Sequence, residues 1–401
     1  MNIIFLTLLD ISDINERGIY HDLLRKFRDE GHQVYVVYPS ERRKNTATAI
    51  RVENGVTLLN VRTMNIQKTN VFEKGIGTLL LEYQFLSGIK KFVSNVRFDL
   101  VLYSTPPITL GKVIQYIKQK DGACSYLLLK DIFPQNAVDL GMIRKGGILH
   151  RFFSKKEKQL YHLSDYIGCM SPANVNYLLS NNRELLADRV EVNPNSIAPV
   201  SYEFPQTDKW KTRDKYQIPQ DAIVFIYGGN LGKPQGVDFL IEVLSANRDR
   251  SNIFFVIVGS GTEYDKIDKW YKGCEPGNIL LLPGLPKKEY DELVKACDTG
   301  LIFLDKRFTI PNFPSRLLSY LEYSMPVIAA TDRHTDIGEI IEEAGAGFWT
   351  QAGDVEEFNK LVHKLLTNSN LIAQMGENAY KLLQTRYTVD VSYNAIMRRI
   401  A

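Results

Sequence analysis

The chain has 401 residues, of which 44% are hydrophobic and 24% charged. Such a composition is typical of soluble globular proteins, and the length predicts two domains of about 200 residues each. No apolar run approaches the roughly 18 residues of a membrane span. The opening MNIIFLTLLD lacks the basic start of a signal peptide and is predicted to be a buried strand.

The net charge of +3 is unevenly distributed along the chain. Residues 1–200 hold 26 Lys and Arg against 19 Asp and Glu, whereas the rest of the chain holds 23 against 27. The basic first half predicts an anionic partner or surface. The acidic second half argues against a nucleic-acid footprint along the whole chain, so no nucleic acid is expected as a partner.

Strands and helices alternate throughout, which predicts two parallel, doubly wound sheets. In the first half an amphipathic helix is expected over 18–30, ending at Gly31, and another over 110–118. The strands of the first half are expected at 2–8, 33–38, 56–61, 99–104, 125–130, 166–170 and 189–193. Those of the second half are expected at 223–228, 253–258, 278–282, 299–304 and 326–330.

A polar, proline-bearing stretch at about 194–220 separates the two halves and is the expected hinge. We therefore expect an N-terminal domain over 1–195 and a second domain over 196–380. Two Rossmann-like domains of this kind leave a central cleft outside the carboxyl ends of both sheets, where ligands normally bind. The architecture alone does not identify a reaction.

The segment YGGNLGKPQGVDFLIE, from Tyr227 to Glu242, is the first candidate for a ligand site. An apolar strand, a glycine-rich turn and an amphipathic helix follow one another, which would direct backbone N–H groups and a helix N-terminus at an anion. Gly229, Asn230 and Lys233 are the candidate ligand contacts in this turn. Such a turn is also a structural necessity of many α/β proteins.

Three more turns follow strands of the second half. Gly259-Ser260-Gly261 is a weak signal that more often marks only a tight turn, and the backbone of Pro283, Gly284 and Leu285 could bracket a flat base. The third turn leads into a helix from Ser315 to about Tyr323. Arg316 in its first turn opposes the helix dipole at a cost of roughly 0.3–1 kcal/mol, which a bound diphosphate would reverse. A solvated surface arginine is the alternative.

Four segments in this order resemble the donor domain of family-4 retaining glycosyltransferases with the GT-B fold: YGGNLGKPQGVDFLIEVL, FFVIVGSGTEYDKI, ILLLPGLPKKEYDELVKACDTGLIFL and FPSRLLSYLEYSMPVIAA. The ending RYTVDVSYNAIMRRI resembles that family's closing helix, so residues 381–401 are expected to cross back onto the first domain. The version of the glycine motif resembles a branch that builds bacterial surface polysaccharides, including transferases of N-acetylfucosamine-type sugars.

The sequence departs from the family pattern at two places. Pro311 and Ser319 stand where many members carry two glutamates, and Glu322 lies one turn further on. Asn230 and Gln235 stand where an Arg and a Lys are usual, so Lys233 and Arg316 would supply the phosphate charge. The resemblance implies that the nucleotide sugar is bound by residues of these turns, with Ser319 or Glu322 near the ribose. The implied contacts are Gly229, Asn230, Lys233, Gly259, Pro283, Gly284, Leu285, Ser315, Arg316 and Leu317.

The first half carries the candidate catalytic residues. In the resembled family a glycine in the position of Gly18 approaches the donor phosphate, although Gly18 could simply start a helix. Lys130 and Asp131 end a buried strand, and the run after Asp131 resembles that of the polysaccharide branch, with Lys130 where other members have a His. Asp131 could orient or deprotonate an acceptor hydroxyl. A helix-capping aspartate is the alternative.

The segment IRKGGILHRFFSKKEKQLYHL, from Ile143 to Leu163, interleaves apolar and basic residues. Such a helix fits the anionic face of a membrane, whereas the alternative is a domain helix with one buried stripe. We favour membrane contact, consistent with a polyprenyl-diphosphate-linked acceptor. The residues assigned to this membrane and acceptor surface are Arg144, Lys145, Arg151, Phe152, Phe153, Lys155 and Lys156.

No metal or cofactor is expected. The six histidines show no metal spacing, the four cysteines are scattered, and no Asp-x-Asp triplet occurs. The sequence therefore predicts an α/β protein of the GT-B fold. We expect a retaining, metal-independent transferase that moves a sugar from a nucleotide sugar, UDP-linked, to a lipid-borne saccharide at the inner leaflet of the cytoplasmic membrane. The alternatives are a UDP-sugar 2-epimerase and a non-catalytic subunit of a polysaccharide assembly complex.

Overall fold

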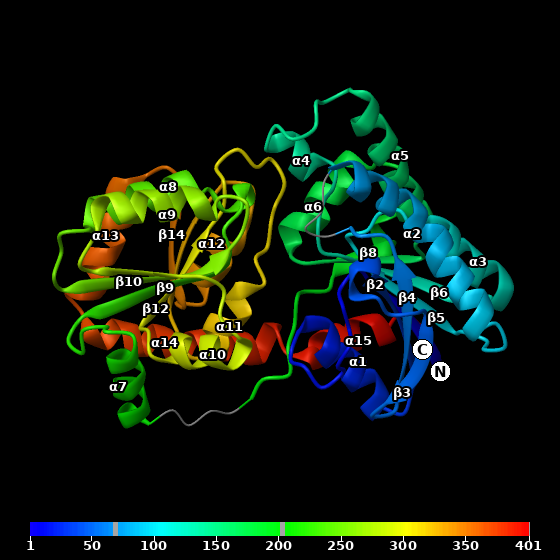
Figure 1. Ribbon diagram of the computed structural model, residues 1–401, viewed down its shortest axis with the longest axis horizontal. Coiled ribbons are helices and arrows are strands. Elements are labelled where there is room, and N and C mark those ends of the chain that lie inside the picture. Colours follow the sequence, from blue (N-terminus) through cyan, green and yellow to red (C-terminus); the bar gives the residue numbers. More distant parts are fainter. Residues whose placement is uncertain (67–70, 201–204, 401) are drawn as a thin grey trace. The chain divides into compact units, whose positions relative to one another are not determined.

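The computed structural model describes residues 1–66, 71–200 and 205–400, and the chain divides into two compact units. The first unit contains Met1–Ala198 and Thr388–Ala401, and the second contains Pro199–Tyr387. The division falls a few residues after the expected boundary at 195/196. It lies inside the proline-bearing segment 194–220, of which residues 201–204 lie outside the described residues. In each unit, helices cover both faces of a twisted sheet (Figure 1).

The first unit is built on a sheet in which β1 and β5 lie side by side near the middle. Its strand order is β3-β4-β2-β1-β5-β6-β7-β8. The elements are β1 (Asn2–Leu6), α1 (Ile19–Asp29), β2 (Gln33–Glu41), η1 (Arg42–Lys44), β3 (Ala49–Glu53), β4 (Val56–Thr63), α2 (Val71–Phe92), β5 (Leu100–Ser104), α3 (Gly111–Asp121), β6 (Cys124–Leu129), α4 (Gln135–Asp139), α5 (Ile148–Leu163), β7 (Tyr166–Cys169), α6 (Pro172–Asn181), η2 (Ala187–Arg189), β8 (Val190–Val192) and α15 (Val389–Met397).

One strand of this sheet departs from the expected parallel pattern. β3 was not expected, and it pairs with β4 in the antiparallel direction at the sheet edge. Its residues AIRVE are almost all exposed, so the strand carries no apolar run by which it could be recognised. The other strand pairs of this sheet are parallel.

The core of the first unit joins the start of the chain to its last helix. Phe5 of β1 and Phe27 of α1 are fully buried in one cluster with Ile396 of α15. The ring of Tyr393 meets that of Phe27 edge to face, with the centroids 5.1 Å apart. The helix expected over 381–401 is in fact two elements, because α14 ends at Arg386 and α15 begins at Val389.

The second unit is built on a sheet in which β9 and β12 are neighbours. Its strand order is β11-β10-β9-β12-β13-β14, and the pairs are parallel. The elements are α7 (Gln206–Lys215), β9 (Ile223–Asn230), η3 (Lys233–Gln235), α8 (Val237–Asn247), β10 (Ile253–Ser260), α9 (Tyr264–Cys274), β11 (Ile279–Leu282), α10 (Lys287–Lys295), β12 (Thr299–Phe303), α11 (Arg316–Glu322), β13 (Val327–Thr331), α12 (Ile337–Glu343), β14 (Gly347–Gln351), α13 (Val355–Leu366) and α14 (Ser369–Arg386).

Both strand orders contain a point at which the winding reverses. The chain builds outward in one direction from β1 and returns to its other side at β5, and it does the same at β9 and β12. Ligands of open α/β sheets bind outside the carboxyl ends of the strands at such a point. The fold therefore directs attention to the residues that follow β9 and β12 in the second unit, and β1 and β5 in the first.

Candidate functional site

The predicted turns of the second unit lie along one edge of its sheet. β9 extends through Asn230, so Gly228 and Gly229 end a strand and do not form the turn that we expected. Gly229 pairs with Gly259 of β10. A Cβ atom on Gly284, which follows β11, would lie 3.9 Å from Oγ of Ser260. The structure thus brings Gly229, Gly259 and Gly284 together at the carboxyl edge.

Arg316 and Gly229 meet at the reversal between β9 and β12. A Cβ atom on Gly229 would lie 3.4 Å from Nη2 of Arg316, and Gly229 has a φ of +121°, a conformation that favours glycine. The guanidinium carbon of Arg316 lies 4.2 Å from the centroid of the Tyr227 ring. Nη1 of Arg316 is buried and has no hydrogen-bond partner among the described residues. Arg316 is therefore not the solvated surface arginine of the alternative interpretation.

The helix that follows β9 does not begin at the glycines. A 3-10 turn, η3, intervenes, and the N-cap residue of α8 is Gly236, whose Cβ would lie 3.3 Å from Cα of Asp305. Nδ2 of Asn230 donates to Oε1 of Gln235 at 2.8 Å. Gly229, Asn230 and Lys233 are all exposed. The expected alignment of the α8 N-terminus with the glycines is wrong, whereas the exposed backbone at the end of β9 stays available to a ligand.

The remaining candidates of the second unit have different surroundings. A Cβ atom on Gly259 would lie 1.9 Å from the carbonyl oxygen of Gly229, so Gly259 lets two strands approach each other. Pro283 and Gly284 are exposed, and Leu285 is half-buried. Gly259 thus has a packing role, while the loop after β11 presents an open surface at the same edge.

The helix α11 separates Ser315 from Glu322. Ser315 is the exposed N-cap residue and makes no side-chain cap hydrogen bond, and Leu317 is buried in the core. Ser319 is half-buried one turn further on. Glu322 is placed elsewhere, because it lies at the far end of α11 and accepts a hydrogen bond from the N–H of Val200. Ser319 therefore lies nearer than Glu322 to the start of α11, and a ribose contact of either residue stays a prediction.

In the first unit, Lys130 and Asp131 follow β6 and are held by Thr105. Oγ1 of Thr105 accepts from the N–H groups of Lys130 and Asp131 at 3.0 and 3.1 Å. Nζ of Lys130 donates to the carbonyl of Asn193 at 3.1 Å, and burial lowers its pKa to about 7. Oδ1 of Asp131 accepts from Nδ2 of Asn136 at 2.7 Å. Burial raises the pKa of Asp131 to about 6. Asp131 is therefore a carboxyl with a raised pKa that is hydrogen-bonded to a residue of α4.

A second acidic residue, Glu157, lies near Asp131 and was not predicted as a site residue from the sequence. Glu157 of α5 accepts a 2.8 Å hydrogen bond from Oη of Tyr161. Burial raises the pKa of Glu157 to about 7, and the nearby charge of Asp131 acts in the same direction. Glu157 stands in a run of lysines, a pattern that is typical of a solvated surface.

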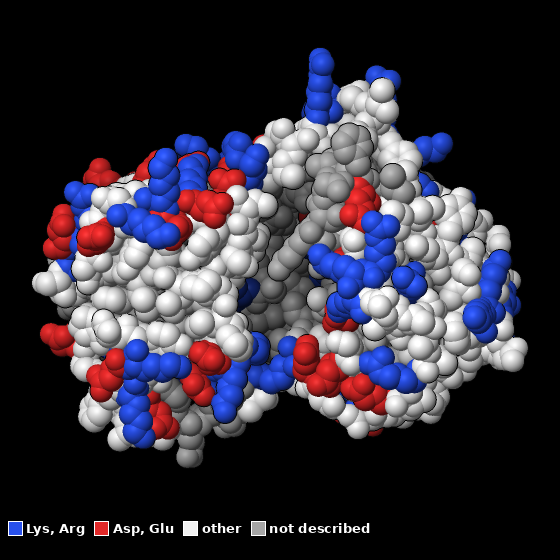
Figure 2. Space-filling model, in the orientation of Figure 1, with Lys and Arg blue, Asp and Glu red and all other residues white. Residues whose placement is uncertain are grey.

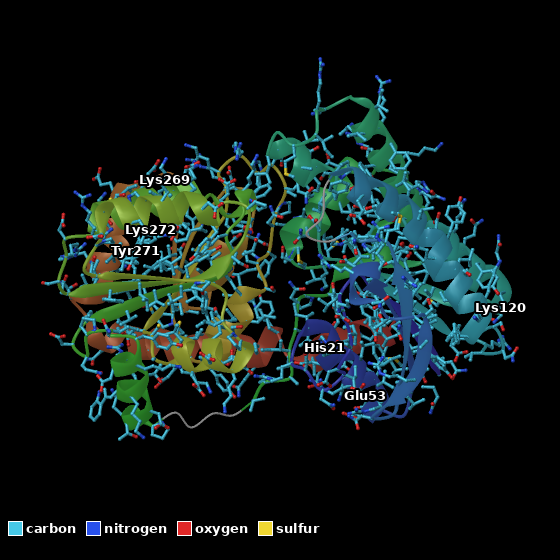
Figure 3. The ribbon with its side chains drawn as sticks, viewed as in Figure 1. His21, Glu53, Lys120, Lys269, Tyr271 and Lys272 are labelled. Carbon is cyan, nitrogen blue, oxygen red and sulfur yellow. The ribbon has the colours of Figure 1, made fainter. Side chains whose placement is uncertain are left out.

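Gly18 is the N-cap residue of α1, and its N–H donates to Oδ1 of Asp22 at 3.3 Å. A Cβ atom on Gly18 would lie 3.1 Å from Nδ1 of His21. His21, labelled on α1 in Figure 3, is buried, and its ring nitrogens have no hydrogen-bond partner among the described residues. Gly18 thus has a local structural role at the start of this helix.

The predicted basic surface is an exposed projection of the first unit at the end of α4 and the start of α5. Arg144, Lys145, Arg151 and Lys155 are exposed, as Figure 2 illustrates by the basic side chains that project from this end. Phe152 is 37% exposed, whereas Phe153 packs against Phe133 with ring centroids 4.9 Å apart. Lys156 is half-buried.

The described residues contain neither a metal-binding cluster nor a helix that could cross a membrane. No group of three or more His, Cys, Asp or Glu side chains in this part of the chain could hold a metal ion. Over the same residues, none of the helices has the length and hydropathy that a membrane crossing requires.

Comparison with known proteins finds a family match within the second unit. Residues 208–382 match the family model described as glycosyl transferases group 1. The chain is 22% identical to the "Probable glycosyltransferase WbjE" of Pseudomonas aeruginosa over 331 residues, covering 81% of this chain and 79% of that protein. It is 21% identical to the "Putative colanic acid biosynthesis glycosyl transferase WcaI" of Escherichia coli over 247 residues, covering 61% and 60%.

Among solved structures, Anabaena Alr3699/HepE in complex with UDP-glucose superposes with a TM-score of 0.71 at 15% identity. The match covers 100% of this chain and 99% of that one. A likeness at this identity establishes the fold of both units. The match to glycosyl transferases group 1 covers most of the second unit, and the superposition shows that the chain has the GT-B fold.

Proposed function

We propose that this enzyme transfers a sugar from a UDP-sugar to a lipid-linked saccharide in the synthesis of a bacterial surface polysaccharide, of the capsule or O-antigen kind. The observation that carries the donor assignment is the pairing of Arg316 with Gly229 at the reversal between β9 and β12. This place offers a cation, exposed backbone and an adjacent open loop at Pro283 and Gly284, which suit a diphosphate and a flat base.

Two relatives support this choice of ligand and pathway. The Anabaena protein was solved with UDP-glucose, and the name of the Escherichia coli relative refers to colanic acid, itself a polysaccharide. We extend a UDP-sugar donor and a polysaccharide product to this chain. An N-acetylfucosamine-type sugar and retention of the anomeric configuration follow from the motif resemblance in the second unit.

In the proposed reaction the acceptor hydroxyl attacks the anomeric carbon as the bond to the UDP oxygen breaks, and the hydroxyl proton leaves with the diphosphate or a nearby base. Arg316 stabilises the charge that develops on the diphosphate, without a metal ion. Asp131 accepts a hydrogen bond from the acceptor hydroxyl and orients it, because its carboxylate is poised near neutral pH.

Release of nucleoside diphosphate from a panel of nucleotide sugars, with and without membrane extract, tests the enzymatic role. We expect acceptor-dependent UDP release, which Arg316→Met reduces by at least about 100-fold. Arg248→Met is the matched control, because Arg248 lies on the exposed end of α8 beside Asp249. Consumption of donor without an acceptor would indicate a 2-epimerase, and silence across the panel with folded protein would indicate a non-catalytic subunit.

We further propose that the enzyme binds peripherally to the inner leaflet through a surface that we name the α4–α5 tip. Its apolar members are far more exposed than core residues: Met142 is 64% exposed, Ile148 88%, Leu149 60% and Phe152 37%. Its exposed basic members are Arg144, Lys145, Arg151 and Lys155. Apolar side chains among cations suit insertion between anionic headgroups, where each cation contributes about 1 kcal/mol.

Vesicle co-sedimentation separates the two contributions of the α4–α5 tip. We expect binding to vesicles with phosphatidylglycerol and little binding to pure phosphatidylcholine. Ile148→Asn combined with Leu149→Asn should weaken binding at low and at high salt, whereas Arg144→Gln with Lys145→Gln should weaken it only at low salt. Val52→Asn is the matched control, because Val52 is 71% exposed on the edge strand β3. An equal loss of vesicle binding in the control would contradict the proposed role of the α4–α5 tip.

A further inference from the structure

The end of β9 carries a contact that the diphosphate assignment leaves unexplained. A Cβ atom on Gly228 would lie 1.9 Å from Oη of Tyr290 and 2.5 Å from its ring carbons Cε2 and Cζ. Tyr290, a residue of α10, therefore lies directly over the α-carbon of Gly228. The space left by this glycine is filled by a protein side chain and not by a ligand.

The two residues beside Gly228 face Arg316. Tyr227 presents its ring to the guanidinium, 4.2 Å from centroid to Cζ, and its hydroxyl donates to the carbonyl of Asn230 at 2.6 Å, which fixes the ring. Gly229 leaves room for Nη2 of Arg316, at 3.4 Å from where a Cβ would stand. Of three consecutive residues of β9, Gly228 thus lies against Tyr290, and its two neighbours lie against Arg316. Both side chains therefore lie at the carboxyl end of this strand.

Tyr290 lies at Gly228, between the two residues of β9 that face this cation. Burial raises the pKa of Tyr290 to about 12, while the charge of Arg316 acts in the opposite direction. The phenol is therefore neutral at physiological pH. Tyr290 is half-buried and does not belong to the described core cluster of the second unit, so close packing of the core does not account for it.

Arg316 needs such support because its position is demanding. Nη1 is buried without a hydrogen-bond partner among the described residues, and an unpaired buried donor is unfavourable. A guanidinium with an unpaired donor would otherwise rotate toward water. The ring of Tyr227 limits this rotation on one side, and a second aromatic wall would keep the cation at Gly229, where the proposed diphosphate arrives.

We propose that Tyr290 is a positioning residue for Arg316: seated on Gly228, its phenol ring keeps the guanidinium over Tyr227 and beside Gly229, and thereby sets the affinity for the diphosphate of the nucleotide. This inference rests on the proposed donor site. It concerns the aromatic ring of Tyr290, which faces Gly228 with Cε2 and Cζ beside its hydroxyl.

Calorimetric titration with UDP tests the inference through a double-mutant cycle. Tyr290→Ala should weaken UDP binding about tenfold, and Tyr290→Phe, which keeps the ring, should restore it to within about threefold of the unmodified protein. In an Arg316→Met background, Tyr290→Ala should have no further effect. Tyr264→Ala, in the neighbouring helix α9, is the matched control and should leave UDP binding unchanged. A tenfold loss that persists in the Arg316→Met background would overturn the inference.

A size exchange at Gly228 supplies a second test. The new Cβ of Gly228→Ala must displace Tyr290, so this variant should reproduce the loss of Tyr290→Ala, and the two changes together should be no worse than either alone. Additive losses would overturn the inference.

A third measurement does not need the nucleotide. In nitrogen-15 spectra, restricted rotation should give Arg316 separate Nη signals that merge in Tyr290→Ala and persist in Tyr290→Phe. Unchanged signals in Tyr290→Ala would overturn the positioning role. An unmodified protein that shows these signals but does not bind UDP would contradict the proposed donor and leave the positioning of Arg316 supported.

Discussion

The backbone N–H of Val200 donates a 3.1 Å hydrogen bond to Oε1 of Glu322. The carboxylate is buried at the C-terminal end of α11, in a cavity that Lys209 and Asp298 also line. Asp298 immediately precedes β12, so this cavity lies where the strands begin and Arg316 lies where they end. Glu322 therefore holds the start of the second unit, at the end of the sheet opposite to that of Arg316.

Replacement of Glu322 by Ala should lower stability without changing donor affinity. The N–H of Val200 loses its acceptor, and we expect the free energy of unfolding to fall by about 1–2 kcal/mol. Urea denaturation measures the loss, and UDP titration should give a dissociation constant within about twofold of the unmodified protein. A tenfold weaker UDP affinity would indicate that Glu322 contacts the ribose.

The pH profile of transfer should report Asp131. Burial raises the pKa of this carboxyl to about 6, and the proposed role requires the ionised form. Below about pH 6, kcat/KM should fall about tenfold per pH unit. Asp131→Asn should lower kcat/KM by about 100-fold or more and abolish this acidic limb, whereas Asp188→Asn, an exposed residue of the same unit, should retain it. An acidic limb that survives in Asp131→Asn belongs to another group.

Glu157 should make the protein less stable as the pH rises. Its pKa is about 7 in the folded protein against an ordinary 4.5, so the folded state holds a proton that the unfolded state releases. The stability that this proton contributes is full below about pH 4.5 and is lost as the pH rises to about 7. Glu157→Gln should be close to the unmodified protein at pH 5 and about 1–3 kcal/mol more stable at pH 8.

Denaturant unfolding of both proteins at the two pH values checks this result. Glu157 also faces Tyr161 and Lys158 on its own helix, Asp131 after β6 and Tyr177 on α6. Equal stability of the two proteins at pH 8 would show that the carboxyl is not a raised, buried acid.

Two glycines of the second unit should respond in opposite ways to the same substitution. In Gly259→Ala the new Cβ would stand 1.9 Å from the carbonyl oxygen of Gly229, so the ends of β9 and β10 must separate. We expect a loss of about 2–3 kcal/mol and weaker UDP binding. In Gly273→Ala the Cβ meets no atom within 4 Å inside α9, and helix propensity should raise stability by about 0.5–1 kcal/mol. Similar Tm changes in both variants would contradict this contrast.

The sequence predicted the strands whose apolar runs are buried on both faces, and it failed where burial does not leave such a run. β5 is buried along its whole length and was expected almost to the residue, whereas the exposed edge strand β3 was missed. The family match confirms the resemblance that the ordered motifs of the second unit suggested.

The candidate site was predictable only as far as local chain geometry determines it. Glycines at the strand end could be read from their spacing, but Gly228 is occupied by Tyr290, which lies on a helix remote in the sequence. Glu157 gained its raised pKa from burial on α5, which a run of lysines conceals. Glu322 lies one helical turn after Ser319, and in the short helix α11 one turn is enough to bring its side chain to the C-terminal end.

The last helix has a consequence for the order in which the protein forms on the ribosome. Ile197 and Thr388 are joined by a parallel bridge, and everything between Pro199 and Tyr387 is translated before α15 exists. The second unit can close its sheet during synthesis, whereas the first must wait with Phe27 uncovered until Tyr393 arrives. The unit that is translated first is therefore completed last, and chaperones would meet it as a nascent chain with an open aromatic patch.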